Sequence, residues 1–297
     1  MYRKTKCKQI LLATFVFYLM ELFLITALLS AQDFFPFETP QGHIRIASWN
    51  IEFLGKRKPR RTQEQIQAVA ERIQTFDAAV LVLQEILKPA VLDDIKTTLG
   101  PSWKINTSWL QNNAFLYDTS KVKMISLEYL KYIKQGKGTS KTKWPGPWYR
   151  KPISGVFRTL DINANTFRII GLHCHWDKSE VRTAEGEWLR SFIIELIKNP
   201  HESNDILLLG DFNGEPGIPP HPSLQQGDYL HMLPKENGNI TNISGRHLDY
   251  VYVSQSLEAK LKKKACFVIR PRNYNESHEQ FEAIYSDHFP VFVDISF

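Results

Sequence analysis

Apolar and polar residues alternate from Ile44 to Ile51, which predicts a β-strand near the start of a folded region. Between Thr62 and Phe76 the apolar residues instead recur at helical spacing, and Thr62 is a suitable N-cap. The inward positions of this predicted helix are Ile66, Val69, Ala70 and Ile73. A strand followed by an amphipathic helix is the typical opening of an α/β domain.

The same patterns continue along the chain. Unbroken apolar runs at residues 79–83 and 206–209 predict buried strands, and residues 89–99 predict a second helix. A long helix is predicted at residues 182–197, with Trp188, Phe192 and Ile193 facing inward. β-rich runs at residues 248–253, 266–269 and 291–295 predict later strands. No internal repeat and no Gly/Ser linker interrupts residues 43–297, which we therefore expect to form one α/β domain.

The first 31 residues have a different character. Four basic residues precede an apolar run from Ile10 to Ala31 in which Glu21 is the only charge. The run is long enough for the ~20 residues that span a bilayer, and the basic leader is typical of export. Leu29 interrupts the small-x-small cleavage pattern before Gln32, so a cleaved signal peptide and an uncleaved membrane anchor both stay open. Either predicts that the folded domain is extracellular, periplasmic or anchored outside the cytoplasm, with residues 32–42 as a linker.

Composition narrows the function classes. Hydrophobic residues make up 43% and charged residues 23%, which is ordinary for a globular protein. The net charge is +6, and the leader supplies four basic residues minus one acidic residue, or half of it. The three cysteines cannot form a disulfide scaffold or a four-thiolate zinc site. Cys174 and Cys266 lie in apolar runs and are predicted to be buried, unreactive thiols.

Polar residues lie at the ends of several predicted strands, at positions that a core would not use, and two of them precede the last strand. Each alone could be a turn, a cap or a solvated strand end. Ligands in open α/β sheets gather outside strand ends, so together these residues could form one site. The set is rich in hard oxygen ligands and has no cysteine, which favours Mg²⁺ or Mn²⁺ over zinc. The residues are Asn50, Glu52, Gln84, Glu85, Asp211, Asn213, Asp287 and His288.

The order of these motifs resembles the endonuclease/exonuclease/phosphatase superfamily, the group of deoxyribonuclease I and the exonuclease III-type AP endonucleases. The resemblance covers about residues 43–297 and implies a four-layer α/β sandwich, two β-sheets flanked by helices, with the site at one edge of the sheets. The motifs that carry it are Ser48-Trp49-Asn50-Ile51, Leu83-Gln84-Glu85-Ile86, Gly171-Leu172-His173, Leu209-Gly210-Asp211-Phe212-Asn213, Leu248-Asp249-Tyr250-Val251 and Ser286-Asp287-His288-Phe289-Pro290.

The resemblance also implies roles for individual residues. Glu85 corresponds to the principal metal ligand, with Asn50 and Asp287 in or near the metal's shell. Glu52 is either a second ligand or a structural surface residue. By the same resemblance, Asp211 and Asn213 position the attacking water and hold the phosphate. His288 contacts the phosphate, and Asp249 orients the ring of His288. His173 protonates the leaving oxygen. Whether Asp211 or His288 takes the proton of the water stays open.

One position departs from the family pattern. Deoxyribonuclease I-like members carry a glutamate that supports the leaving-group histidine, where this sequence reads Gln111-Asn112-Asn113. An amide can orient an imidazole ring but cannot stabilise its positive charge. We therefore expect His173 to be a weaker acid than in those relatives, or to take its partner elsewhere.

The substrate is predicted from basic and aromatic residues. Arg150, which precedes a Lys-Pro pair, resembles a substrate-contacting arginine of deoxyribonuclease I. Residues 131–151 combine seven basic residues with Trp144, Trp148 and Tyr149, and residues 56–61 add a second basic run. Cations and stacking rings suit nucleic acid, so a metal-dependent endonuclease is the leading hypothesis. A lipid or inositol-phosphate phosphodiesterase or phosphatase, sphingomyelinase-like, and a non-catalytic binding module on the same scaffold are the alternatives.

Overall fold

The computed structural model describes residues 38–297 except 56–60, 108–111, 131–149, 162 and 262. The predicted leader, most of the linker and the centre of the basic loop therefore lie outside the described residues. The described part belongs to one compact unit, Pro36–Phe297. None of its helices has the length and apolar character needed to cross a membrane.

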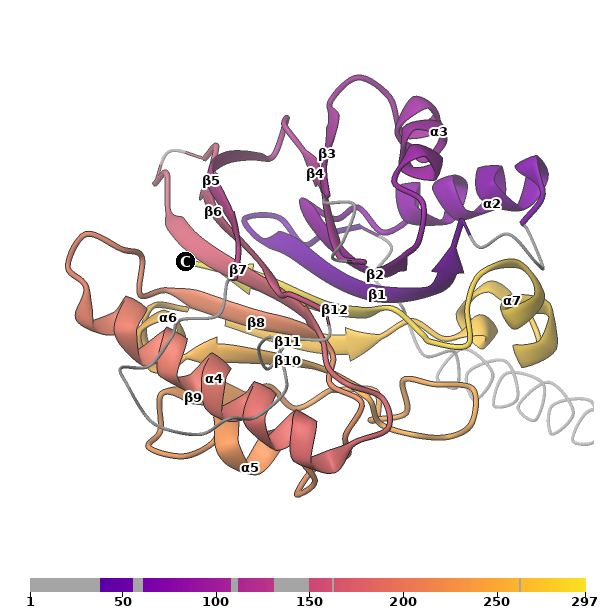
Figure 1. Ribbon diagram of the computed structural model, residues 1–297. Coiled ribbons are helices and arrows are strands. Elements are labelled where there is room, and N and C mark those ends of the chain that lie inside the picture. Colours follow the sequence, from indigo (N-terminus) through magenta and orange to yellow (C-terminus); the bar gives the residue numbers. More distant parts are fainter. Residues whose placement is uncertain (1–37, 56–60, 108–111, 131–149, 162, 262) are drawn as a thin grey trace, which may run out of the picture. The chain divides into compact units, whose positions relative to one another are not determined.

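Two six-stranded sheets form the centre of this unit (Figure 1). The first has the order β11-β12-β1-β2-β4-β3 and the second the order β5-β6-β7-β8-β10-β9. Both are mixed, because β1 pairs with β2 and β7 with β8 in parallel whereas the other pairs are antiparallel. The strands are β1 (Ile44–Leu54), β2 (Val80–Ile86), β3 (Trp103–Thr107), β4 (Ala114–Asp118), β5 (Val122–Tyr129), β6 (Ile153–Thr159), β7 (Thr166–His173), β8 (Ile206–Asp211), β9 (Leu230–Met232), β10 (Asp249–Ser254), β11 (Lys263–Val268) and β12 (Val291–Ser296).

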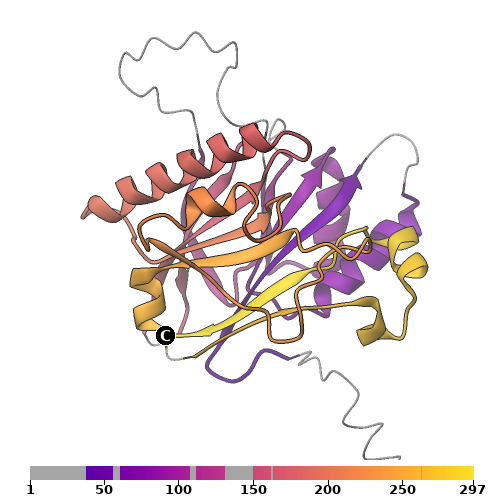
Figure 2. The ribbon, with the colours of Figure 1, turned by 90° about the horizontal axis from the view of Figure 1, so that it is seen from below.

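Helices cover the outer faces of both sheets. The pair α2 (Gln63–Gln74) and α3 (Ala90–Leu99) packs on the first sheet, and α4 (Ser179–Lys198) with α5 (His221–Leu224) packs on the second. Seen from below, the sheets lie between α4 and the α2–α3 pair (Figure 2). Short helices α6 (Gln255–Lys260) and α7 (His278–Ile284) and the 3-10 turn η1 (Pro271–Tyr274) lie between the last strands. This arrangement confirms the predicted four-layer sandwich.

The described elements agree with the predicted ones where the pattern was strong. Thr62 caps α2 and forms a capping box with Gln65, and the four predicted inward residues of that helix are buried. The strand at β1 is longer than predicted and its alternation is misleading, because both of its faces are covered. Arg45, on what would have been a solvent face, is buried and pairs with Asp294 at 2.7 Å. A buried cation is tolerated there because its hydrogen bonds are satisfied.

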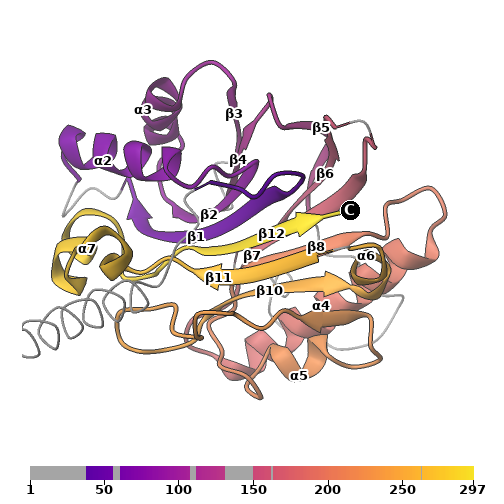
Figure 3. The same cartoon turned by 180° about the vertical axis from the view of Figure 1, so that it is seen from behind.

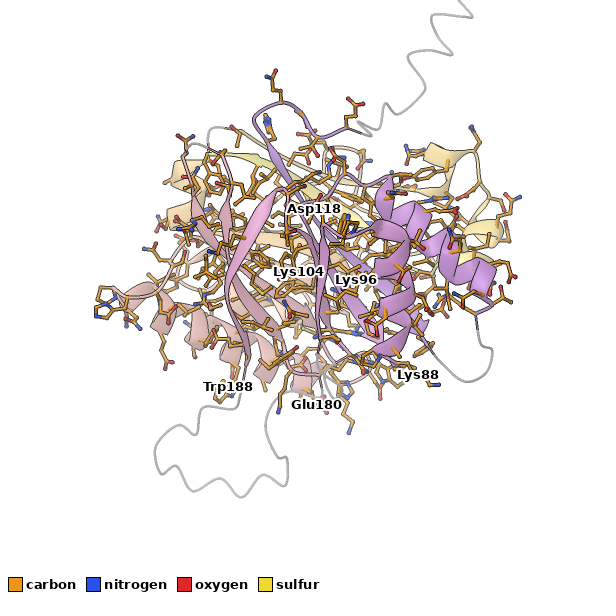
Figure 4. The ribbon with its side chains drawn as sticks, turned by 90° about the horizontal axis from the view of Figure 1, so that it is seen from above. Lys88, Lys96, Lys104, Asp118, Glu180 and Trp188 are labelled. Carbon is orange, nitrogen blue, oxygen red and sulfur yellow. The ribbon has the colours of Figure 1, made fainter. Side chains whose placement is uncertain are left out.

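The predicted inward face of α4 is partly wrong. Leu189, Ile193 and Leu196 form the buried stripe, whereas Trp188 is only partly buried. Trp188 extends outward from the helix, away from the sheets (Figure 4). Because neighbouring residues on a helix point about 100° apart, shifting the stripe by one position moves Trp188 off it.

Both described cysteines match the expectation. Cys174 and Cys266 are buried and free. Burial raises the pKa of the Cys266 thiol to about 12, so it stays protonated and unreactive.

The sheet pairing brings the motif residues to one edge. The parallel pairs β1–β2 and β7–β8 end at the same edge, and their registers align Asn50 with Gln84 and His173 with Asp211. The antiparallel strand β10 begins there, with Asp249 opposite Asp211. Viewed from behind, this edge lies toward α7, at the end of β12 opposite the C-terminus (Figure 3).

Candidate active site

An open cavity of about 710 Å³ lies at this edge of the sheets. Every residue predicted for the site lines it, with two exceptions: Asp249 lies directly behind His288, and Gln84 is fully buried and donates to Ser48 Oγ at 3.1 Å. The predicted residues that line the cavity are Asn50, Glu52, Glu85, Arg150, His173, Asp211, Asn213, Asp287 and His288. The fold therefore brings together residues that are up to 238 positions apart (288 minus 50).

Glu85 and Asn50 form the floor of the cavity. The Asn50 Nδ2 donates to Glu85 Oε1 at 3.2 Å and to Asp211 Oδ2 at 3.0 Å, so one amide links the two carboxylates. The backbone N–H of Phe53 donates to the other oxygen, Glu85 Oε2, at 3.1 Å. Glu85 has a φ of 63°, in the left-handed region that non-glycine residues rarely adopt. Such strain is concentrated at functional sites, where it fixes a side chain in one direction.

Asp211 and Asn213 follow β8 on a tightly constrained turn. The Asn213 N–H donates to Asp211 Oδ1 at 2.8 Å, and the Asn213 Nδ2 donates to the Cys174 carbonyl at 3.0 Å. Gly210, just before them, has a φ of +147°, and a Cβ there would lie 2.1 Å from the carbonyl oxygen of Leu172. Only glycine fits this close approach, so the strand can turn Asp211 into the cavity.

His288 and Asp249 form a buried hydrogen-bonded pair. The His288 Nδ1 donates to Asp249 Oδ2 at 2.8 Å, and its Nε2 points toward Asp211 Oδ2 at 3.8 Å. The backbone around His288 is held on both sides, by the Trp49 Nε1 at 2.9 Å from its carbonyl and by the Ser286 Oγ at 3.0 Å from its N–H. The ring thus has one orientation, with Nε2 facing the cavity.

Burial and neighbouring charge raise the pKa values of both Asp211 and His288. Burial raises the pKa of Asp211 to about 7, with the Asp249 carboxylate adding to the effect and the positive charge of His288 opposing it. Burial alone would lower the pKa of His288, but the carboxylates of Asp249 and Asp211 outweigh it and raise that pKa to about 10. At neutral pH the His288 ring is therefore an imidazolium.

His173 lies close to both Asp211 and Glu85. Its Nε2 lies 3.5 Å from Asp211 Oδ2 and 3.8 Å from Glu85 Oε1. Burial, together with the positive charges of Arg150 and His288, holds its pKa well below the usual range. Its buried Nδ1 has no hydrogen-bond partner among the described residues. This agrees with the missing glutamate, although Gln111 itself lies outside the described residues.

The acidic side of the cavity fits a divalent cation. The pKa of Glu52 is raised by burial and then by the nearby carboxylates of Asp287, Glu85 and Glu282, against the opposing charge of Arg61. Such mutual repulsion between oxygen ligands is what a hard cation would remove. Ligand atoms of Asp211, Asp249 and His288 also lie within 4.8 Å of one another. An imidazolium is a poor ligand, so the carboxylate side of Glu85 fits better.

Two arginines of the predicted basic segments have different surroundings. Arg150 lines the cavity, and its Nη1 lies 3.4 Å from the Cys174 carbonyl. Arg61 instead donates to the backbone carbonyls of Glu52, Ile284 and Tyr285 and ties α7 to the end of β1. In the second basic run, the described residue Arg61 is thus structural, and residues 56–60 lie outside the described part.

Several cavity residues were not predicted. Trp176, Phe53 and Arg246 line the rim, and the Asn242 Nδ2 lies 3.4 Å from Asp287 Oδ2. Trp176 follows the motif histidine by three positions, and Phe53 follows Glu52, so nearness to a motif was the available signal. Arg246 and Asn242 precede the Leu248-Asp249 motif in a loop with no pattern of its own.

Comparisons with known proteins identify the family and the fold of this chain. Residues 47–288 match the endonuclease/exonuclease/phosphatase family. No curated protein matches the chain. Solved structures share its fold at low identity, which by itself shows the fold alone. A mannosyl-6-phosphatase from Bacteroides thetaiotaomicron superposes with a TM-score of 0.59 at 18% identity, over 86% of this chain and 100% of that chain.

Two further structures are similar to the same extent. The human Nocturnin catalytic domain with bound sulfate has a TM-score of 0.58 at 16% identity, over 87% of this chain and 96% of that one. D. rerio TDP2, complexed with a single-strand DNA product, has a TM-score of 0.61 at 13% identity, over 86% and 100%. The family match over most of the sequence, on a two-sheet sandwich with the motif residues in one cavity, shows that this chain belongs to the endonuclease/exonuclease/phosphatase family.

Proposed function

We propose that this family hydrolase is a phosphodiesterase that depends on Mg²⁺ or Mn²⁺ and cleaves nucleic acid. The observation that supports this reaction type is the buried pair of His288 and Asp249, which leaves His288 Nε2 3.8 Å from Asp211 Oδ2 in an acidic cavity. A phosphodiester resists anionic attack, so its hydrolysis needs a positive charge on the phosphate and a base beside the water. The cavity offers both.

The geometry supports Asp211, rather than His288, as the base that accepts the proton of the water. Asp211 is fixed by hydrogen bonds from Asn50 and Asn213, and its pKa of about 7 suits it to accept a proton from water. His288, protonated and locked by Asp249, holds negative charge on the phosphate and cannot act as the base near neutral pH. His173, uncharged, can donate one hydrogen bond from Nε2 toward the leaving oxygen.

The metal ligands of the proposal are Glu85, Asn50 and Asp287, with Glu52 as a possible additional ligand at the rim. A divalent ion bound there would neutralise the phosphate and lower the pKa of a bound water. The residues themselves contribute orientation, because Asn50 fixes the distance between Glu85 and Asp211 through its two hydrogen bonds.

Nucleic acid is favoured by the rim of the cavity. Arg150 and Arg246 supply guanidinium groups for phosphates, and Trp176 and Phe53 supply exposed rings. This is the combination that binds a phosphodiester chain with bases attached. The basic loop at residues 131–149 would extend it, although that segment lies outside the described residues.

The test is a substrate panel on the purified protein with and without Mg²⁺: plasmid, RNA, a single-stranded oligonucleotide, phosphoinositide, sphingomyelin vesicles and a sugar monophosphate. We expect metal-dependent cleavage of nucleic acid, absent in Asp211→Asn. Faster turnover of phosphoinositide or sphingomyelin would replace the nuclease proposal with a lipid phosphodiesterase that uses the same residues.

We also propose that residues 1–31 export this domain or tether it outside the cytoplasm. The support is the basic leader followed by the apolar run from Ile10 to Ala31. A tethered enzyme would meet nucleic acid released into the surroundings of the cell.

A further inference from the structure

Trp176 is the most exposed of the large hydrophobic residues in the described part of the chain. Its surface is 66% exposed, although it lines the catalytic cavity three residues after His173. A single exposed apolar residue on a surface has no special meaning. An exposed indole at the rim of a cavity lined by carboxylates and arginines needs a separate reason, because its ring contributes little to folding there.

The backbone that carries Trp176 is held rigidly from below by α4. Glu185 Oε2 accepts from the His175 N–H at 2.9 Å, and Arg182 Nη1 lies 3.1 Å from the His175 carbonyl and 3.3 Å from that of Trp176. The N–H groups of Asp177 and Lys178 both donate to His175 Nδ1, at 3.2 and 3.1 Å. The tip of this loop is therefore fixed before any substrate arrives.

Holding the loop in this way has an energetic cost. Arg182 and Glu185 are both buried, and charged groups are rarely buried without a compensating role. Arg182 also donates from Nε to the Pro219 carbonyl at 2.9 Å, which ties the loop to the segment after Asn213. The network thus fixes the backbone that carries the exposed ring of Trp176. Preorganisation of this kind lowers the entropy lost when a ligand binds.

A second exposed ring belongs to the same cavity. Phe53 is 40% exposed and lines the same cavity. Its N–H contacts one oxygen of Glu85, while His173 lies near the other oxygen. Phe53 lies on β1 of the first sheet and Trp176 follows β7 of the second, so each sheet contributes one exposed ring to the cavity.

The neighbours of the rings decide which ligand they suit. Glu52, Glu282 and Asp287 line the cavity beside Phe53, and such acids disfavour contact with a lipid surface. Arg150 and Arg246 favour a chain of phosphates instead. The flat faces of bases in a duplex are covered by their neighbours, whereas an unpaired base can stack on a protein ring. The ligand that fits two rings, two arginines and an acidic metal centre is a single strand.

We propose that Trp176, with Phe53 in the same cavity, forms a stacking subsite for an unpaired base next to the scissile phosphate and makes the enzyme selective for single-stranded nucleic acid. This inference rests on the proposed nuclease function. It assigns substrate selectivity to a residue outside the catalytic set.

The test compares kcat/KM for three substrates of one sequence: a single strand, the same strand with abasic sites beside the cleaved bond, and the duplex. Base stacking on an aromatic residue contributes an amount that corresponds to about 5- to 150-fold in affinity. Trp176→Ala should therefore lower kcat/KM for the intact single strand by about this factor, mainly through KM. It should leave the abasic and duplex values near wild type, and Trp176→Phe should retain most of the activity.

Trp188→Ala is the matched control. It removes the same side chain from α4, at a position that does not line the cavity (Figure 4), and should leave the ratio of single-strand to duplex cleavage unchanged. An equal loss on intact and abasic strands would overturn the stacking subsite while leaving the nuclease function standing. Loss of vesicle binding in Trp176→Ala, with oligonucleotide cleavage intact, would also overturn it. Absence of any nucleic-acid cleavage by the wild type would instead remove the proposed function itself.

Discussion

Replacing Asp249 with Asn is the most informative single change in the site. Asp249 is buried, lies outside the cavity surface, and contacts His288 through one hydrogen bond of 2.8 Å. Asparagine keeps the shape and can still accept that hydrogen bond, but it carries no charge. The variant therefore separates the charge of His288 from its position.

The size of the effect follows from the pKa of His288. With the carboxylates present that pKa is about 10, so at pH 8 the ring is about 99% protonated. Without Asp249, burial lowers the pKa of His288 with less opposition from neighbouring carboxylates. A ring that returned only to its ordinary pKa of 6.5 would be about 3% protonated at pH 8. Activity at pH 8 should fall by at least about 30-fold from protonation alone.

The assay is the pH dependence of kcat/KM on an oligonucleotide. The wild type should rise to a plateau near pH 7, where Asp211 loses its proton, and stay level until about pH 10, where His288 loses its own. Asp249→Asn should lose the alkaline half of the plateau and recover activity as the pH is lowered toward 6.5. Asp118→Asn, a buried carboxylate on β4 away from the cavity, is the control (Figure 4). A loss of activity in Asp249→Asn that is equal at every pH would refute the charge argument.

Three further predictions address the metal, the loop support and the leader. EDTA should abolish activity and Mg²⁺ or Mn²⁺ restore it, with Glu85→Gln needing more metal; full turnover in chelator would contradict the proposed centre. Burial raises the pKa of Glu185 from 4.5 to about 7, so the stability present below pH ~4.5 is lost as the pH rises through about 7. Glu185→Gln should reduce the fall in the free energy of unfolding between pH 5 and pH 8 by up to ~3 kcal/mol, as measured by urea unfolding. The same pH dependence in the variant and the wild type would contradict this role of Glu185. Finally, deleting residues 1–31 should leave the protein in the cytosol in cell fractionation, whereas an intact full-length chain in the cytosol would exclude export.

The sequence was most informative where one physical constraint dominates. The α2 helix was predictable because a cap and an apolar stripe agree, and Asp211 and His288 stood out because polar residues ending buried strands are unusual. Asp249 and His173 were found only through the family resemblance. Their positions depend on sheet pairings between distant strands, which no local pattern records.

Other features could not be predicted because their partners are remote in sequence. Arg61 belongs to a basic run, yet it binds carbonyls more than 200 positions away, in Ile284 and Tyr285. Arg182 and Glu185 on α4 are buried because they bind the backbone of the loop that follows β7, and this loop cannot be identified as their partner from the sequence. Trp176 resembles an ordinary loop residue until its exposure at the cavity is known.

In the proposed reaction, Asp211 and a protonated His288 hydrolyse a nucleic-acid phosphodiester with a bound divalent metal. The most direct test is to measure both cleavage and binding of a single-stranded oligonucleotide in Mg²⁺ by the wild type and by Asp211→Asn. The account predicts that kcat falls by about 10²–10⁴ in the variant while oligonucleotide affinity stays near wild type, because the lost group acts in the transition state. Undiminished cleavage by Asp211→Asn, in a protein shown to be folded, would contradict it.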